Sequence, residues 1–288
     1  MIKKVIVFLI ASNYCFGQLP NTDLWLFSLK KEKDVYSIEK GENITKRDGY
    51  DNQPSFSEDG KNIYYVSIQE DKQADVYVYN ISDKKSVQLT KTKESEYSPI
   101  FINSNKKINC VVVEKDSAQR IWLYDEKLGV QTKLLFDEDS VGYYNFLNED
   151  TVLYYKLTKP HSLRARCLSS GKDVWIADHP TRGFKTINRH EFIFGVKDSV
   201  NINFYIYNSV LQKATNYCIY NSLNEDILWH PVWGLLKSEK SGILRFDEKQ
   251  NKWLALFDLT SFGIIKIARF TFDPKDKKIV VVNDIKAN

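Results

Sequence analysis

Three acidic residues form the first group in this 288-residue chain whose chemistry must be considered. Asp51, Glu96 and Asp139 lie in three polar segments that lead into apolar runs. Glycoside hydrolases place two carboxyl groups on either side of the scissile bond, one of them acting as the acid. Acidic loops also serve solubility, so a carboxylate pair is an alternative here and not the first interpretation.

Histidine supplies the second group. His161, His179 and His230 are three of the four histidines, and a metal-dependent lyase would use such imidazoles as ligands. No HxH or HxxxH pair pre-organises them, and no CxxC or Cys/His spacing indicates zinc. We therefore expect no bound metal and no cofactor.

Nucleophilic chemistry has less support. The GxSxG elbow of serine hydrolases does not occur. Behind the leader described below, Cys110, Cys167 and Cys218 remain. An odd number at wide spacing is not a disulfide framework, so we expect three small buried hydrophobic residues. No catalytic residue is assigned from the sequence.

These residues are positioned by a repeat of about 45 residues. Pro54 is followed by a polar turn and the apolar run Ile63–Val66, and Pro99 and Tyr144 occupy the same register at successive spacings of 45. A second apolar run follows in each unit, as in Asp75–Tyr79. Four strands in 40–45 residues are typical of a β-propeller blade. The aromatic residues that recur at one register of the third strand are expected to pack between blades: Trp25, Tyr77, Trp122 and Tyr205.

The two ends of the chain complete the count of blades. Residues 23–27 resemble a third strand, whereas 269–272 and 277–281 resemble a first and a second strand. Phe56 and Phe272 are 216 positions apart, in register with the other repeats. We therefore predict an all-β, six-bladed propeller of four-stranded blades, closed by N- and C-terminal strands that share one blade. The expected blades are 22–41 with 267–283, then 50–91, 96–136, 141–178, 183–218 and 227–259.

The first 17 residues are typical of a signal peptide. Lys3 and Lys4 precede the apolar run 5–11, which is about half the ~20 residues that a membrane span needs. Its removal would leave residues 18–288 as a single propeller domain, with no transmembrane segment. Positive and negative charges are interspersed and the full chain carries only +4, so a nucleic-acid partner is not expected.

The repeat units resemble the TolB-type WD40-like repeat. The resemblance is most specific in Pro54–Lys61, Ile63–Ser67, Asp75–Tyr79 and Val87–Thr90, and by register it covers the whole chain behind the leader. It implies a six-bladed propeller exported to the periplasm or cell surface of a bacterium. TolB itself carries a separate N-terminal domain, which we do not expect here, and this argues against a direct TolB role.

Function in propellers usually resides where the loops between blades meet at one mouth of the central channel. We expect a monomer that binds an envelope protein or a peptide there, without catalysis. The alternatives are a carbohydrate-binding or carbohydrate-active propeller that uses the same mouth, and a purely structural envelope component. The candidate binding residues are Tyr50, Asp51, Glu96, Tyr97, Tyr143, Arg182, Trp229 and His230.

Overall fold

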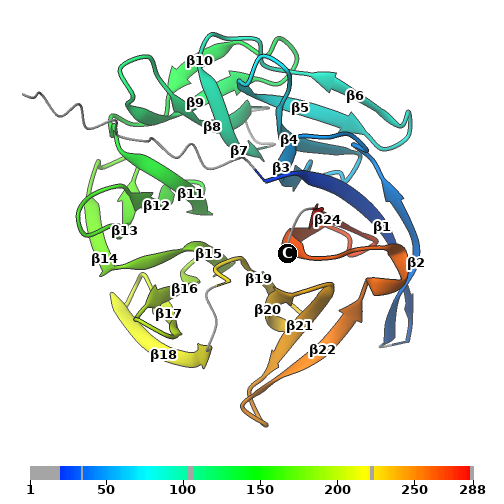
Figure 1. Cartoon of the computed structure of the whole chain (residues 1–288). Coiled ribbons are helices and arrows are strands. Elements are labelled where there is room, and N and C mark those ends of the chain that lie inside the picture. The colour runs from blue at the N-terminus through cyan, green and yellow to red at the C-terminus, as the bar shows by residue number, and fades with distance from the viewer. Residues whose placement is uncertain (1–19, 34, 103–106, 221–223, 286–288) are drawn as a thin grey trace, which may run out of the picture.

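The strands form a closed ring of β-sheets around a central axis (Figure 1). This computed structural model describes residues 20–33, 35–102, 107–220 and 224–285; the signal peptide expected at 1–17 lies outside them. The described strands form four separate four-stranded antiparallel sheets and one larger sheet that contains both ends of the chain. The ring thus has six blades, as the repeat predicts. Among the described residues, no helix has the length and hydropathy to span a membrane.

The closing blade joins the two ends of the chain. Strand β1 (Thr22–Glu32) pairs antiparallel with β24 (Lys278–Asp284) over seven residue pairs. Strand β23 (Ile267–Phe272) is innermost and β2 (Val35–Asn43) is outermost. This order confirms that each end supplies half of one blade. A single parallel bridge from Thr22 to Tyr50 connects it to the next blade.

The other five blades each use four consecutive strands, from innermost to outermost. We number them 2 to 6 in chain order. Blade 2 is β3 (Tyr50–Phe56), β4 (Asn62–Ile68), β5 (Ala74–Asn80) and β6 (Lys85–Gln88); blade 3 is β7 (Ser95–Ile102), β8 (Lys107–Val113), β9 (Gln119–Asp125) and β10 (Gln131–Leu134); blade 4 is β11 (Val141–Asn148), β12 (Thr151–Lys156), β13 (Ser162–Cys167) and β14 (Asp173–Asp178); blade 5 is β15 (Pro180–Asn188), β16 (Glu191–Lys197), β17 (Ile202–Asn208) and β18 (Lys213–Tyr220); blade 6 is β19 (Ile227–His230), β20 (Gly234–Glu239), β21 (Gly242–Asp247) and β22 (Lys252–Asp258).

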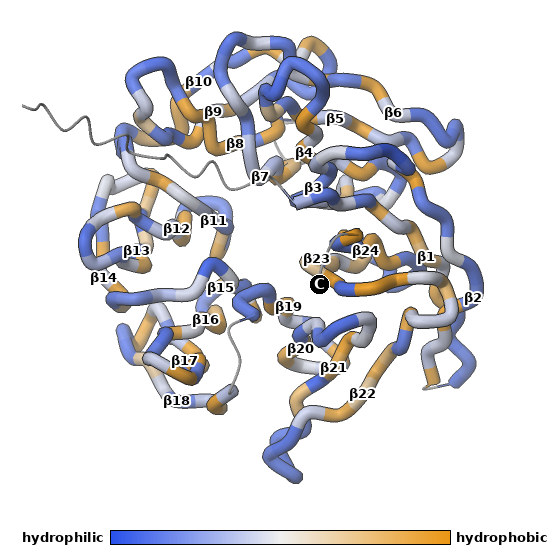
Figure 2. The backbone as a smooth tube through the Cα atoms, viewed as in Figure 1, coloured by the Kyte–Doolittle hydropathy of each residue, from blue (hydrophilic) through white to orange (hydrophobic). Residues whose placement is uncertain are grey.

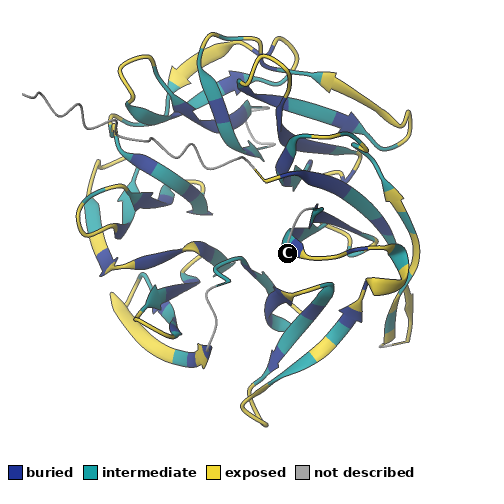
Figure 3. Ribbon diagram, viewed as in Figure 1, coloured by how far each residue is buried: buried dark blue, intermediate teal, exposed yellow. Residues whose placement is uncertain are grey.

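Burial explains which residues form which strand. The second strand of each blade has sheet neighbours on both sides and packs against both adjacent blades, so it is a continuous apolar run, as in β4 and β8. The outermost strands β6 and β10 are short and exposed. Figure 2 shows hydrophilic turns around apolar strands, and Figure 3 shows that exposure concentrates at the outer rim.

The hydrophobic core lies in the wedges between blades. In the wedge between blades 2 and 3, for example, Tyr64 packs with Ile108 and Tyr124. The recurring aromatic residues of the third strands contribute to these wedges, which confirms their packing role: Trp25, Tyr77, Trp122 and Tyr205.

The three cysteines within the described residues are free thiols. Cys110 and Cys218 are buried in the wedges, as expected. Cys167 is different, because it ends β13 and is partly exposed, with its Sγ 3.1 Å from Asp150 Oδ2. The expectation of a buried residue was therefore wrong for Cys167.

Candidate functional site

The two faces of the ring carry different connections. On one face lie the loops from an outermost strand to the next innermost strand, together with the turns between second and third strands; we call it the inter-blade face. The opposite face carries the turns between first and second and between third and fourth strands; we call it the hairpin face. Each innermost strand therefore begins at the inter-blade face and ends at the hairpin face.

The innermost strands of all six blades line a central channel with a volume of about 260 Å³. One register position of the repeat supplies lining residues in four blades. These residues are 45 or 216 positions apart and come from β3, β7, β11 and β23: Gln53, Ser98, Tyr143 and Arg269.

Most of these strands are bulged where they line the channel. The pairing register shifts between Asn52 and Ser55, between Tyr97 and Ile100, and at the corresponding points of β11, β15 and β23. A β-bulge inserts a residue that is left out of the ladder and redirects its side chain. A regular strand would direct these side chains elsewhere, whereas the bulges turn them towards the channel.

Two of the bulges hold non-glycine residues in the left-handed region. Gln53 has φ of 56° and Ser98 has φ of 52°. The two bulges are also bonded to each other, because the backbone N–H of Ser98 donates to Gln53 Oε1 at 2.5 Å. Tyr144 of the next blade donates to the Ser98 carbonyl at 3.0 Å. Strained backbone held by its neighbours in this manner is a common property of binding sites.

Three tyrosines from successive blades lie around the inter-blade end of the channel. Burial raises the pKa of Tyr50 to about 12; the positive charge of Arg269 opposes this shift, and Tyr143 and Tyr97 add to it. Tyr50 and Tyr97 pack against the same buried cluster of Val66, Ile68 and Ala74, and Tyr143 lines the channel together with Arg269. The structure thus brings together Tyr50, Tyr97 and Tyr143, three of the residues predicted from the sequence.

Arg182 is the fourth predicted residue at the inter-blade end of the channel. Its guanidinium lies 5.8 Å from the centroid of the Tyr143 ring, and its Nε is 3.3 Å from Glu225 Oε2. Lys197 forms a second ion pair with Glu225. Burial raises the pKa of Glu225, but the hydrogen bonds and charges of Lys197 and Arg182 outweigh burial and hold that pKa below its ordinary value.

Three further charged residues line the channel: Lys185, Asp226 and Arg269. The sequence analysis did not identify them as candidates. Arg269 Nε lies 3.3 Å from Asp226 Oδ1. Lys185, on β15, has no hydrogen-bond or ion-pair partner among the described residues. The repeat register could have identified Arg269, because it aligns with Gln53. No comparable pattern marks Lys185 or Asp226.

A side pocket of about 460 Å³ opens on the inter-blade face between blades 4 and 5. His161 and His179 both line it, and the His179 backbone N–H donates to the His161 carbonyl at 2.9 Å. Arg182 lines both this pocket and the channel. Within the described residues, no group of three or more His, Cys, Asp or Glu is arranged to hold a metal ion.

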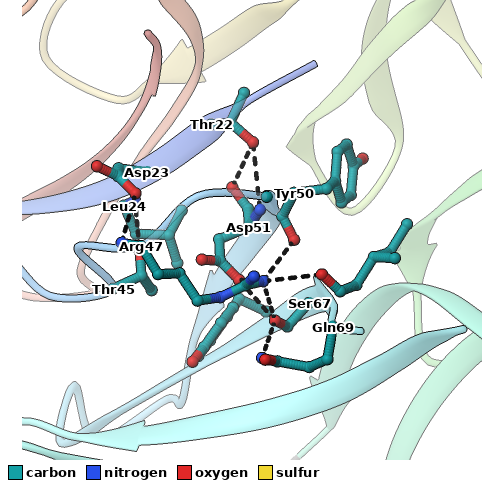
Figure 4. Close-up of polar contacts among 12 residues, drawn as sticks. Thr22, Asp23, Leu24, Thr45, Arg47, Tyr50, Asp51, Ser67 and Gln69 are labelled. Atoms are coloured by element: carbon teal, nitrogen blue, oxygen red, sulfur yellow. Dashed lines mark hydrogen bonds and ion pairs between the residues drawn. The ribbon is translucent and has the colours of Figure 1, made fainter. Parts of the chain in front are cut away.

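Asp51 is committed to a structural network (Figure 4). Its Oδ1 accepts hydrogen bonds from Arg47 at 2.7 Å and from Ser67 at 2.6 Å, and its backbone N–H donates to Thr22 Oγ1 at 3.2 Å. Burial raises the pKa of Asp51, and the Ser67 and Arg47 contacts offset that rise only in part. The Arg47 side chain also donates to the Tyr50 carbonyl, so this network joins the closing blade to blade 2.

Glu96 is similarly enclosed. Its carboxylate accepts hydrogen bonds from Thr90 at 2.9 Å, from Tyr124 at 3.0 Å and from Thr92. Burial raises the pKa of Glu96 to about 7 despite these bonds. Asp139 is exposed in the loop between β10 and β11. None of the three predicted acids lines the channel, so the structure does not assemble them into a hydrolytic pair.

Trp229 and His230 lie at the hairpin face, not at the mouth where the sequence placed them. They end the four-residue strand β19 and pair with Leu235 and Gly234. His230 stacks on Trp233 at 4.0 Å, and its Nε2 is 3.0 Å from Asp276 in a turn of the closing blade. His230 is therefore separated from His161 and His179, and the three histidines do not converge.

Comparison with known proteins identifies the fold. No protein-family model matches the sequence, and no curated protein matches it. Among solved structures, a TolB-like protein from Agrobacterium tumefaciens superposes with a TM-score of 0.67 at 10% identity over 93% of this chain and 99% of that one. TolB from Acinetobacter baumannii gives 0.60 at 12% identity, over 91% and 64%.

An oligogalacturonate lyase solved in complex with manganese is also similar. Its TM-score is 0.58 at 10% identity, and the match covers 88% of this chain and 83% of that chain. Together with the strand order, these likenesses show an all-β, six-bladed propeller of the TolB type.

Proposed function

We propose that this protein is a non-catalytic recognition propeller that binds a segment of a partner protein at the inter-blade end of its channel. The observation that carries the proposal is the convergence of Tyr50, Tyr97, Tyr143 and Arg182 around bulged strands. Tyrosine and arginine are enriched among the residues that dominate binding energies. The ring closure and the bonded bulges hold these groups in place, so binding requires little ordering of the protein.

The titratable groups favour binding over catalysis. Asp51 and Glu96 both serve hydrogen-bond networks within and between blades. A general acid or base must reach the substrate within hydrogen-bond distance, directly or through one water. Neither carboxylate lines the channel, so neither has this access.

A carbohydrate-active propeller is the second candidate. The oligogalacturonate lyase provides the same fold with manganese bound. In the present chain, the side pocket offers two imidazoles, His161 and His179, with Arg182 beside them. A metal-dependent activity would need further ligands from a substrate or from water, since His230 is at the opposite face.

We further propose that the protein acts in a bacterial envelope or outside the cell. The basic and apolar pattern of residues 1–17 supports export, and the TolB-type fold agrees with that location. Expression of the full chain with a periplasmic reporter would test it. A reporter that remains in the cytoplasm would contradict export.

The test of partner binding compares two surfaces of the same ring. A Tyr143→Ala/Arg182→Ala variant removes two groups at the inter-blade end, and Val232→Ala alters an exposed turn of the hairpin face. Each protein, of verified fold, would capture partners from an envelope extract, and a captured protein would then be purified for direct titration. We expect the first variant to weaken binding at least tenfold and the control to bind normally. Equal binding by all three proteins would contradict the proposed surface.

A further inference from the structure

We propose that the central channel is a carboxylate-binding site in which Lys185 is the primary cation and that its ligand is an acidic segment of the partner. This inference rests on the proposed function, because it names the chemistry of the segment that enters the channel. It is drawn from the charges around the channel and from the size of the opening.

The charges that line the channel and its entrance do not balance. Three cations, Arg182, Lys185 and Arg269, line the channel with a single carboxylate, Asp226. Asp226 is already paired with Arg269, and Arg182 is paired with Glu225 beside the channel. The channel therefore carries an excess of two positive charges.

Lys185 is the cation that this pairing leaves over. Its side chain is partly accessible because the channel is open, but protein surrounds it. This desolvation lowers the pKa of the Lys185 amine, and repulsion from Arg269 lowers it further. The attraction of Asp226 does not cancel these two effects. A partly desolvated cation without an ion-pair partner is unfavourable, and an incoming carboxylate would relieve that cost.

The remaining geometry limits what can deliver the carboxylate. A volume of about 260 Å³ admits a few residues of extended chain but no folded domain. Phenol groups already lie along the route, since Tyr143 lines the channel and the Tyr50 hydroxyl is hydrogen-bonded to the channel residue Gln53 at 3.3 Å. Hydrogen bonds between a cation and a carboxylate are stronger than those between neutral groups, so specificity would favour acidic over neutral ligands.

The test titrates three probes into the full-length protein by calorimetry. The probes are hexaglutamate with blocked ends, hexaglutamine with blocked ends, and trigalacturonate as an acidic sugar. We expect hexaglutamate to bind and hexaglutamine not to bind. We expect Lys185→Gln to weaken hexaglutamate at least tenfold, the scale of one charge-assisted hydrogen bond, and Lys185→Arg to retain most of the affinity.

The matched control is Lys213→Gln, which removes the same charge from the same blade at an exposed site on β18. Circular dichroism and thermal unfolding would verify the fold of every variant. Affinity for hexaglutamate that is equal in the wild type and Lys185→Gln, or that falls equally with Lys213→Gln, would overturn the assignment of Lys185.

The three probes separate the inference from the function on which it rests. Trigalacturonate that binds through Lys185 while hexaglutamate does not would support the carboxylate site and contradict a protein partner. A captured partner that loses affinity with Tyr143→Ala/Arg182→Ala but not with Lys185→Gln would support the function and overturn the inference. No binding of either acidic probe would also overturn the inference.

Discussion

The ammonium group of Lys237 lies 3.1 Å from the centroid of the Tyr220 ring, although these residues belong to different blades. Lys237 is on β20 of blade 6, and Tyr220 ends β18 of blade 5. Trp253 covers the same ammonium at 4.5 Å, and Glu239 pairs with it at 3.1 Å. A lysine that is 2% exposed thus fills the wedge between two blades.

Two replacements of Lys237 separate the contribution of its apolar side-chain stem to stability from the contribution of its charge. Lys237→Met retains the volume and removes a buried cation, so we expect stability within about 1 kcal/mol of the wild type. Lys237→Ala leaves a cavity and should cost about 2–4 kcal/mol. Urea unfolding measures both values. Equal losses in the two variants would show that the charge itself holds the wedge.

Removal of Arg47 should be severe because it leaves the buried Asp51 carboxylate without its cation. We expect Arg47→Met to lower the free energy of unfolding by about 3–5 kcal/mol. The exposed pair between Lys30 and Glu32 offers a control, and Lys30→Met should cost less than about 1 kcal/mol. Chemical denaturation reports both changes; a small loss in Arg47→Met would contradict a structural role for the network.

Glu96 should make the fold less stable as the pH rises. Burial raises its folded pKa to about 7 from the ordinary 4.5, so protonated Glu96 favours the folded state. The contribution of Glu96 to the free energy of unfolding is complete below about pH 4.5 and is lost as the pH rises through 7. The loss in the free energy of unfolding is at most about 3 kcal/mol.

The variant Glu96→Gln isolates this effect. The free energy of unfolding, measured from pH 5 to pH 8, should fall less in the variant than in the wild type. Asp51 and Asp75 also have raised pKa values, so the difference between the two proteins is the quantity to compare. Parallel curves would mean that Glu96 is not the group that titrates.

Alanine substitutions at two glycines distinguish the cost of backbone strain from the cost of a steric clash. Gly129 and Gly263 have φ of 61° and 82°, so an alanine at either position costs about 1–2 kcal/mol in backbone strain. At Gly129 the added Cβ would also collide with the Leu89 carbonyl of the neighbouring blade, whereas at Gly263 it would meet nothing. We expect Gly129→Ala to lower the melting temperature clearly more than Gly263→Ala; equal shifts would rule out that contact.

The repeat register predicted the architecture because it follows directly from packing. Every blade buries its second strand, so runs such as Ile63–Val66 recur at fixed spacing and mark the blade even when the turns differ. The same register predicted the shared closing blade through Phe56 and Phe272. Tyr50, Tyr97 and Tyr143 were found because they lie within the first three residues of innermost strands, and their place in the ring follows from the order of the strands.

The remaining parts of the site depend on local geometry that spacing does not encode. Blade 6 has an innermost strand of only four residues, so Trp229 and His230 reach the opposite face within a few positions. The bulges at Gln53 and Ser98 are bonded to each other across two blades, a contact that spacing in the sequence does not show. Lys185 differs from the other cations of the channel only in lacking an ion pair, which spacing in the sequence does not show.

The pairing of β1 with β24 has a consequence for how the chain reaches its folded state. More than 240 residues separate these partners in sequence, so the ring has an unusually long-range contact that local structure cannot replace. During synthesis on the ribosome, the edge of β1 that pairs with β24 keeps its backbone N–H and C=O groups unpaired until β24 has emerged. Contacts between distant segments slow folding and prolong the exposure of such edges, which makes the nascent protein a natural client for chaperones that shield strand edges.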